Sequence, residues 1–279
     1  MSEVYVDFAQ VYDTFMDETP YEEWCDYLME LIQTYGISRP AALQSVSSQS
    51  DASISNSADV NEEQHIVLDL GCGTGTLTEL MASKGYDMIG IDCSPQMLRL
   101  AKEKSIAAEH KTLYLLQDMR EMELYGTIGT VISVCDSLNY LLTEEDLIRT
   151  FRLVNNYLYP NGIFIFDFNT VYKYEQVIGD TTIAENREAC SFIWENYYDE
   201  ESQINEYDVT VFVRENEDLY RRFEEIHMQR GYTIEQMEHC LEQAGLKFVM
   251  SMDADSHGQI TEQSERIYVI ARENGKQNG

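Results

Sequence analysis

Three glycines at alternate positions follow a short apolar run, and this stretch is the chemically most informative part of the sequence. The run covers residues 66–70, and the glycines are Gly71, Gly73 and Gly75. A strand that ends in a glycine-rich turn before a helix lets the backbone approach a ligand closely. A dinucleotide site would need the third glycine at position 76, where the chain has Thr76. This spacing disfavours an NAD-dependent oxidoreductase, which remains an alternative of another class.

Acidic residues mark the ends of three successive apolar runs. Asp69 lies in the first run, Asp92 ends the second and Asp118 follows the third. In an open α/β sheet the ligand crevice lies at the carboxyl ends of the strands, so these carboxylates are expected to line one crevice. Asp92 is placed to accept both hydroxyls of a ribose, although a helix N-cap or a turn also explains it, and a turn explains Asp118. No lysine or arginine is adjacent to the glycines in sequence, which suits a ligand without phosphate.

Together these motifs resemble the successive nucleoside-binding motifs of class I S-adenosylmethionine-dependent methyltransferases. The resemblance is close over about residues 60–170 and looser elsewhere. It implies S-adenosylmethionine as cofactor, with its methionyl part against the three glycines and its ammonium near Asp69. The other implied roles are Asp92 for the ribose diol, Cys93 and Met97 for packing the adenine, Asp118 and Met119 for its amino edge, and Cys135 with Asp136 beside the methyl donor.

The N-terminus carries a second resemblance. The stretch Tyr5-x-x-Phe8-Ala9-x-x-Tyr12-Asp13 is similar to a segment of small-molecule methyltransferases, including glycine and amino-sugar N-methyltransferases, that closes over the cofactor. Tyr12 is therefore a candidate cofactor-binding and catalytic residue. Tyr5, Phe8 and Tyr12 share one helical face, and an amphipathic docking helix explains them equally well.

Methyl transfer from a sulfonium is an in-line displacement, so positioning the two reactants supplies much of the catalysis. A nitrogen or oxygen acceptor must also lose a proton, for which a nearby base helps. His227, in the stretch 225–232, is the candidate base, and a histidine satisfied within a sheet is the alternative. Arg230 and Tyr232 are candidate acceptor contacts.

The elements that must position these residues follow from hydrophobic periodicity. Strands are expected at residues 66–70, 88–91, 112–116, 130–134 and 163–168, with helices at 77–83, at 97–104 and after Thr143. This alternation predicts an α/β fold with a doubly wound parallel sheet covered on both faces. The resemblance further implies a Rossmann-like methyltransferase fold of seven strands, mostly parallel, with the last strand antiparallel.

The chain divides into five regions. Residues 1–37 are expected to form an N-terminal helical cap, and 38–64, with eight serines and no aromatic residue, a flexible linker or loop. Residues 65–179 form the cofactor-binding core, which 231–279 complete with a helix and two strands. Between them, 180–230 read as three alternating, aromatic-rich strands of an antiparallel insertion. Such an insertion suits a lid, a homodimer surface, or both.

The charge of the chain limits the classes of molecule that it is expected to bind. Acidic residues outnumber basic ones 50 to 19, for a net charge of −31. Such a surface disfavours nucleic acid, whose binding depends on Lys and Arg neutralising phosphates, and it disfavours anionic membranes. A small-molecule acceptor is therefore expected, with a protein or tRNA acceptor, or a catalytically silent binding subunit, as the alternatives.

The six cysteines are scattered, without zinc-ligand spacing, which predicts reduced thiols, no metal and a cytoplasmic location. The start of the chain has no export signal, and no apolar stretch reaches bilayer length.

Overall fold

The computed structural model describes residues 9–43, 62–216 and 219–276. Short helical turns are η1 (Glu62–His65), η2 (Ser137–Tyr140) and the π-type η3 (Lys173–Ile178). The helices are α1 (Ala9–Phe15), α2 (Tyr21–Tyr35), α4 (Thr76–Ser83), α5 (Pro95–Ala107), α6 (Glu144–Tyr157) and α7 (Ile234–Gln243). The strands are β1 (Ile66–Leu70), β2 (Asp87–Asp92), β3 (Leu113–Leu116), β4 (Ile128–Ser133), β5 (Leu158–Asn169), β6 (Thr182–Asn186), β7 (Cys190–Asp199), β8 (Ile204–Asn216), β9 (Leu219–Arg230), β10 (Lys247–Asp253) and β11 (Arg266–Arg272).

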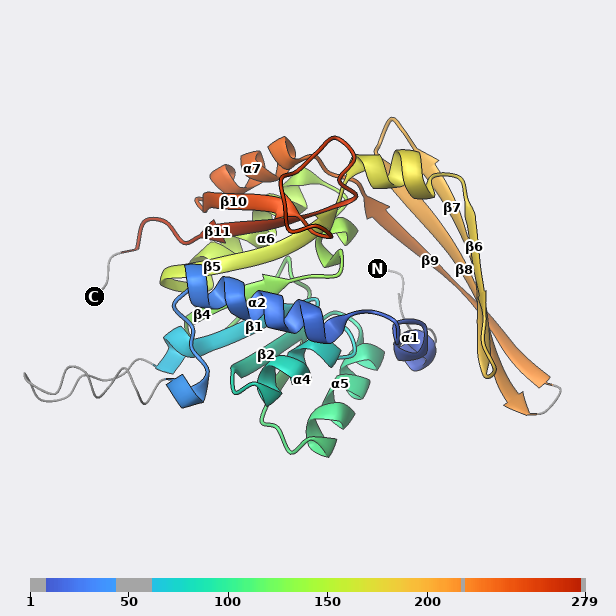
Figure 1. The fold of residues 1–279 in the computed structure, drawn as a ribbon, viewed down its shortest axis with the longest axis horizontal. Helices are drawn as coiled ribbons and strands as arrows, with labels where there is room; N and C mark the ends of the chain where they lie inside the picture. Colours follow the sequence, from blue (N-terminus) through green and yellow to red (C-terminus); the bar gives the residue numbers. More distant parts are fainter. Residues whose placement is uncertain (1–8, 44–61, 217–218, 277–279) are drawn as a thin grey trace, which may run out of the picture.

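The central sheet has seven strands in the order β10-β11-β5-β4-β1-β2-β3. The pairings β5–β4, β4–β1, β1–β2 and β2–β3 are parallel, whereas β11 is antiparallel to both of its neighbours. This arrangement confirms the predicted doubly wound sheet with an antiparallel last strand. In Figure 1, α2, α4 and α5 lie on one face of the sheet, and α6 and α7 lie on the other.

The strands are apolar on both faces because each face packs against helices. On β5, Phe164 and Phe166 join the core cluster that includes the apolar stripes of α6 and α7. Ile163 and Ile165, which alternate with them, join the cluster formed with α2 and α4. Two covered faces explain why the strands read as continuous apolar runs rather than alternating ones.

The inserted region forms a second, antiparallel sheet in the order β6-β7-β8-β9. Figure 1 shows this inserted sheet beside the core, with α1 between it and α5. The three predicted strands correspond to β7, β8 and β9. The edge strand β6 went unpredicted, because four of its five residues are exposed and it has no alternating pattern.

Both N-terminal predictions extend beyond the described residues. Tyr5 and Phe8, and the central part of the predicted linker at 44–61, lie outside them. The first linker residue is integrated into the core, because Ser38 is fully buried and its hydroxyl lies 2.8 Å from Thr130 Oγ1. In the described part of the chain, none of the helices is long and apolar enough to cross a membrane.

Candidate active site

The glycine loop joins β1 to α4 and is shaped by left-handed backbone. Gly71, Gly73 and Gly75 have φ values of +86°, +55° and +73°, a region that costs L-residues about 1–2 kcal/mol each. A Cβ on Gly75 would lie 2.5 Å from Tyr114 Oη. At Gly73, no atom of the described residues lies within 4 Å of such a Cβ. The loop is therefore packed against Tyr114 at Gly75 and open at Gly73, where a ligand has room.

A buried hydrogen-bonded group supports the loop from beneath. Tyr114, on β3, donates its hydroxyl to Glu79 Oε1 at 2.7 Å, and Glu79 Oε2 lies 2.7 Å from His110 Nδ1. The Tyr114 ring also occupies the space beside Gly90, where a Cβ would lie 2.6 Å from it. The sequence analysis missed this group, because its members come from α4, β3 and the loop between α5 and β3.

Asp92, at the end of β2, holds the glycine loop in place. Its Oδ2 accepts the Gly73 backbone N–H at 2.9 Å, and its Oδ1 accepts the Ser94 N–H at 2.7 Å. Burial raises the pKa of this carboxyl above its usual value, while the backbone hydrogen bonds oppose the shift. Each carboxylate oxygen retains further acceptor capacity. The ribose-binding role of Asp92 stays a prediction, and its position beside the open side of the loop is consistent with it.

Asp69 is a buried carboxyl with little compensation for its charge. Burial, with a smaller contribution from the nearby Asp92, raises its pKa to about 7, although a hydrogen bond from Thr78 opposes the shift. The Thr78 hydroxyl donates to Asp69 Oδ2 at 2.6 Å. A cation bound nearby would favour the ionised form, which is what the predicted contact with an ammonium group requires.

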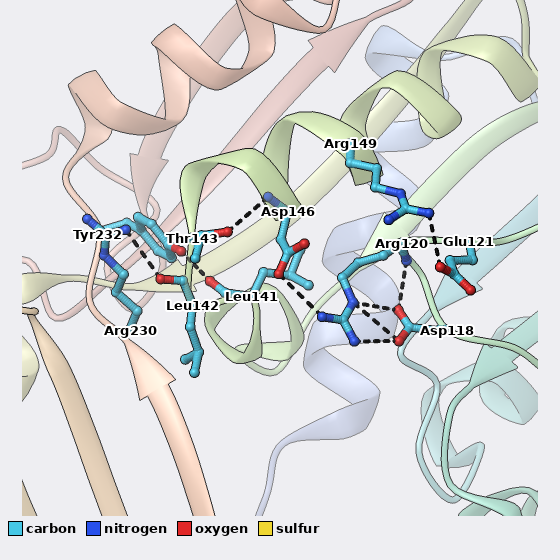
Figure 2. A network of polar contacts seen from close by, with 10 residues as sticks. All are labelled: Asp118, Arg120, Glu121, Leu141, Leu142, Thr143, Asp146, Arg149, Arg230 and Tyr232. Carbon is cyan, nitrogen blue, oxygen red and sulfur yellow. Dashed lines mark hydrogen bonds and ion pairs between the residues drawn. The ribbon is translucent and has the colours of Figure 1, made fainter. Parts of the chain in front are cut away.

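On the predicted adenine side, Asp118 is engaged by an arginine that the sequence analysis missed. Arg120 binds both oxygens of Asp118, with Nη2 2.6 Å from Oδ2, and also reaches Asp146 Oδ2 at 3.3 Å. Figure 2 shows the guanidinium of Arg120 lying between the two carboxylates. The hydrogen bonds from Arg120 lower the pKa of Asp118. A fixed, ionised Asp118 is oriented by this pair before any ligand binds.

The three apolar residues predicted for the adenine site differ in exposure. Cys93 is exposed after β2, whereas Met97 is 2% exposed within α5. Met119 is half-buried, and its Cε lies 3.6 Å from the position of a Cβ on Gly71. Cys93 and Met119 are therefore accessible at the carboxyl edge of the sheet, while Met97 belongs mainly to the core.

No basic residue is next to the glycines in the sequence, but the fold brings a lysine beside the glycine loop, so the absence of a cation there is not a property of the site. Lys104, on α5, approaches the hydroxyls of Thr76 and Thr74 at 2.6 and 3.0 Å. Its Nζ also lies 2.7 Å from Asp13 Oδ2. The fold brings this cation to the loop from almost 30 residues downstream, and an acidic residue compensates its charge.

The short helix α1 docks against this loop. Asp13 accepts the Thr74 hydroxyl at 2.6 Å, in addition to its ion pair with Lys104. Tyr12 lies beside the Cys135 thiol at the end of β4, and burial together with Cys135 raises the pKa of its hydroxyl. The structure therefore brings Tyr12 and Cys135 together at the carboxyl edge of the sheet.

The other end of α1 contacts the inserted sheet. The rings of Phe15 and Phe192 meet edge to face with centroids 4.7 Å apart. Just after the helix, Asp17 Oδ2 lies 2.5 Å from a guanidinium nitrogen of Arg187. The helix α1 thus contacts both the glycine loop and the inserted sheet.

The inserted sheet joins the core through Gln229 on β9. Its amide nitrogen donates to Asp136 Oδ2 at 2.5 Å, and its Oε1 accepts the hydroxyls of Tyr174 and Tyr207 at 2.7 and 2.6 Å. Asp136 directly follows Cys135 after β4. This contact places one face of β9 against the carboxyl end of β4.

His227 lies on the same face of β9, between Glu225 and Gln229, and all three side chains are buried. Its Nδ1 is 3.2 Å from the Tyr140 hydroxyl, and its Nε2 is 3.5 Å from Glu225 Oε2. A histidine placed between a carboxylate and a hydroxyl is oriented for proton transfer. Tyr140 was missed because it lies far from His227 in the sequence, and Glu225 was missed although strand alternation places it on the same face as His227.

The two candidate acceptor contacts are both engaged within the protein. Arg230 Nη1 donates to the Leu142 carbonyl at 3.3 Å. Tyr232 is fully buried, and its hydroxyl donates to the Leu141 carbonyl. Figure 2 shows both side chains against this segment before α6. The burial of Tyr232 argues against a direct contact with the acceptor.

The sheet order, the left-handed glycine loop and the acidic residues at the strand ends define an S-adenosylmethionine-dependent methyltransferase. Residues 67–162 match the family described as "Methyltransferase domain". The chain is 33% identical to the putative methyltransferase YqeM of Bacillus subtilis (strain 168), over 96% of this chain and 97% of that protein. The chain therefore belongs to the methyltransferase family.

Solved structures agree with this assignment. An S-adenosylmethionine-dependent methyltransferase from Clostridium acetobutylicum ATCC 824 aligns with a TM-score of 0.79 at 27% identity, covering 96% of this chain and 98% of that chain. CalS10 from Micromonospora echinaspora, described as an amino pentose methyltransferase and solved with S-adenosylmethionine bound, aligns with a TM-score of 0.67 at 16% identity. The alignment with CalS10 covers 95% of this chain and 97% of that chain, and it shows the shared fold.

S-adenosylmethionine is accordingly the cofactor, and the residues present fit it. The space at Gly73 accommodates a ligand close to the backbone, and the raised pKa of Asp69 marks a carboxyl that an ammonium would ionise. Asp92, beside that space, provides oxygen acceptors for hydroxyl groups. When bound, the cofactor supplies the methyl group on a positively charged sulfur.

Proposed function

We propose that this methyltransferase transfers the methyl group to a nitrogen or oxygen atom of a small molecule held between the carboxyl edge of the core and the inserted sheet. The contact between Gln229 and Asp136 carries this proposal, because it brings the buried row of β9 to the end of β4. That row contains His227, the candidate base. We place the reaction in the cytoplasm, since six free cysteines are typical of a reducing compartment.

In the proposed mechanism His227 removes the proton that the acceptor must lose. Glu225 near Nε2 favours a proton on that nitrogen and leaves Nδ1 as the basic atom. The Tyr140 hydroxyl, 3.2 Å from Nδ1, carries the acceptor's proton to it. Tyr12, beside Cys135, closes the N-terminal side of the site and excludes water from the sulfonium.

Two observations support a small acceptor. The net charge of −31 opposes binding to the phosphates of tRNA. CalS10, described as an amino pentose methyltransferase, has the same fold along nearly its whole length. An amine-bearing or hydroxyl-bearing metabolite is therefore the proposed acceptor class.

A methylation screen tests this proposal. The purified protein is incubated with methyl-labelled cofactor and separated pools of small metabolites, proteins and RNA, with Asp92→Ala protein as the control that binds cofactor poorly. Label in the metabolite pool that depends on intact Asp92 supports the proposal. Label only in the protein or RNA pool overturns the small-molecule assignment. Cofactor binding without transfer to any pool would indicate a catalytically silent subunit.

A further inference from the structure

The turn after β4 contains two consecutive non-glycine residues in the left-handed region. Cys135 has φ of +61° and Asp136 has φ of +53°. Such conformations persist only when surrounding structure enforces them, and they concentrate at functional sites. The Ser137 hydroxyl donates to the Gly71 carbonyl at 3.2 Å, so this turn contacts the glycine loop directly.

A single carboxylate enforces this conformation. Asp167, on β5 and fully buried, accepts the Cys135 N–H on Oδ2 at 3.0 Å and the Asp136 N–H on Oδ1 at 2.8 Å. An Arg266 nitrogen lies 3.7 Å from Asp167 Oδ2 and compensates its charge. The guanidinium of Arg266 in turn lies over the Trp24 ring, 4.7 Å from the centroid. Burial and the nearby Asp136 raise the pKa of Asp167 to about 6, while Arg266 and the two backbone hydrogen bonds favour its ionised form.

The carboxyl of Asp136 has a different set of contacts from that of Asp167. Its side chain accepts hydrogen bonds from two uncharged groups, the amide of Gln229 and the thiol of Cys135. Its side chain is half-buried, and burial raises its pKa, with Lys173 and Arg266 opposing the shift. A cationic group that approaches the turn would therefore favour the ionised form of Asp136.

The cofactor's sulfonium joins its methionyl part to its ribose. If the methionyl part lies along the glycines and the ribose at Asp92, as proposed, the sulfonium would lie between them, on the side of Gly71 that faces the turn after β4. We propose that Asp167 is a positioning residue that holds Cys135 and Asp136 in their left-handed conformation and so directs the Asp136 carboxylate toward the sulfonium. The inference rests on the cofactor placement used in the proposed function, and it does not depend on His227 or on the acceptor.

The proposal predicts a preference for the charged cofactor over its uncharged product, and calorimetry measures it without any acceptor. S-adenosylhomocysteine lacks the methyl group and the positive charge, so the ratio of the two dissociation constants reports how strongly the site stabilises a positive charge at the cofactor's sulfur. In Asp167→Asn the amide can accept only one of the two N–H groups on its oxygen. We expect the preference for S-adenosylmethionine to fall about tenfold in Asp167→Asn and in Asp136→Asn, the size of one modest charge–charge interaction.

A matched control exists at the opposite edge of the sheet. Glu273 is also buried and also accepts the N–H of a left-handed residue, Asn161, at 3.0 Å, near the start of β5. Glu273→Gln should reduce thermal stability and leave the preference for S-adenosylmethionine unchanged. An equal loss of affinity for both ligands in Asp167→Asn, or no change in their ratio, would overturn the proposal.

Glycine substitution provides the mechanistic test. Glycine adopts positive φ without steric cost, so Cys135→Gly should reduce the effect of Asp167→Asn in a double-mutant cycle. The same double variant addresses folding, because it should fold even if Asp167→Asn alone does not. If glycine rescues neither folding nor the ligand preference, Asp167 is only a packing residue and the proposal fails. Failure to find an acceptor would leave these binding ratios intact, which separates this inference from the proposed function.

Discussion

The cofactor side of the site is built largely from backbone, whereas the side formed with the inserted sheet is built from side chains. At the glycine loop, left-handed φ angles and missing side chains create the surface on which a ligand lies. At the inserted sheet, Gln229, His227 and Glu225 on β9 meet Asp136 and Tyr140 from the core. The first side depends on local chain geometry, and the second depends on how distant elements pack.

This difference has a consequence for the effect of substitutions. A side chain added to the backbone-built side must displace atoms that support the loop, so one substitution should affect folding and binding together. A side chain removed from the other side leaves the backbone intact. Changes to the β9 side chains His227 and Glu225 should act on turnover and leave cofactor affinity unchanged.

The largest effect is expected at Gly75. Gly75→Ala places a Cβ against Tyr114 and Ala101 at positive φ. Overpacking and strain should together cost about 2–5 kcal/mol of unfolding free energy, and affinity for the cofactor should fall as well. Denaturant unfolding and calorimetry measure both. Gly275→Ala is the control, because Gly275 has φ of +110° but no atom of the described residues within 4 Å of its added Cβ. A loss no larger than that of the control would contradict the packed-loop description.

The second largest effect is expected at His227, on the side of the site that is formed with the inserted sheet. His227→Ala should lower turnover about 10²-fold or more, since general-base catalysis contributes about 10²–10⁴, with cofactor affinity unchanged. Single-turnover methylation measures this once an acceptor is identified. The exposed His239, on α7, is the matched control and should tolerate alanine. Normal turnover in folded His227→Ala protein would make His227 a structural residue.

Asp92→Ala should weaken cofactor binding by about 1.5–3 kcal/mol, typical of hydrogen bonds to a charged group. The chain should still fold, because Asp92 lies at the edge of the sheet and not in its core. Asp87, exposed at the other end of β2, provides the control. If calorimetry gives equal affinities for Asp92→Ala and Asp87→Ala, Asp92 does not bind the cofactor.

The smallest effect is a pH dependence from Asp69. With a pKa of about 7 in the free protein, Asp69 is mostly protonated at pH 6 and mostly ionised at pH 8. The cofactor's ammonium favours the ionised form, so binding below pH 7 must release a proton. Affinity should therefore be about tenfold weaker at pH 6 than at pH 8, and Asp69→Asn should flatten this profile. A wild-type profile as flat as that of the variant would exclude Asp69 as the titrating group.

The core strands and the glycine loop could be predicted because their signals are local. A strand buried on both faces appears as a short apolar run, and the loop carries three glycines within five residues. The start of β5 was harder to predict, since the strand begins at Leu158, before the predicted start at residue 163, and includes Asn161 at positive φ. The unpredicted strand β6 is short, exposed and at the edge of its sheet.

The residues that support the site could not all be predicted, because some of their contacts are not apparent from the local sequence. Arg120 and Glu225 each lie two residues from the side chain that they contact, whereas Asp167 has no local pattern that indicates its role. Asp167 contacts a turn more than 30 residues before it. Its role depends on the adjacency of β4 and β5, and only the folded structure reveals that adjacency.

The helix α1 has a consequence for the timing of ligand exchange. Seven residues are too few for a helix to persist alone in water, so α1 owes its order to Asp13 at the glycine loop and to Phe15 at the inserted sheet. If the cofactor passes between these surfaces, it must break one of these contacts, and we expect the helix to unwind when that contact is lost. The rate at which spent cofactor leaves would then depend on a folding event of seven residues.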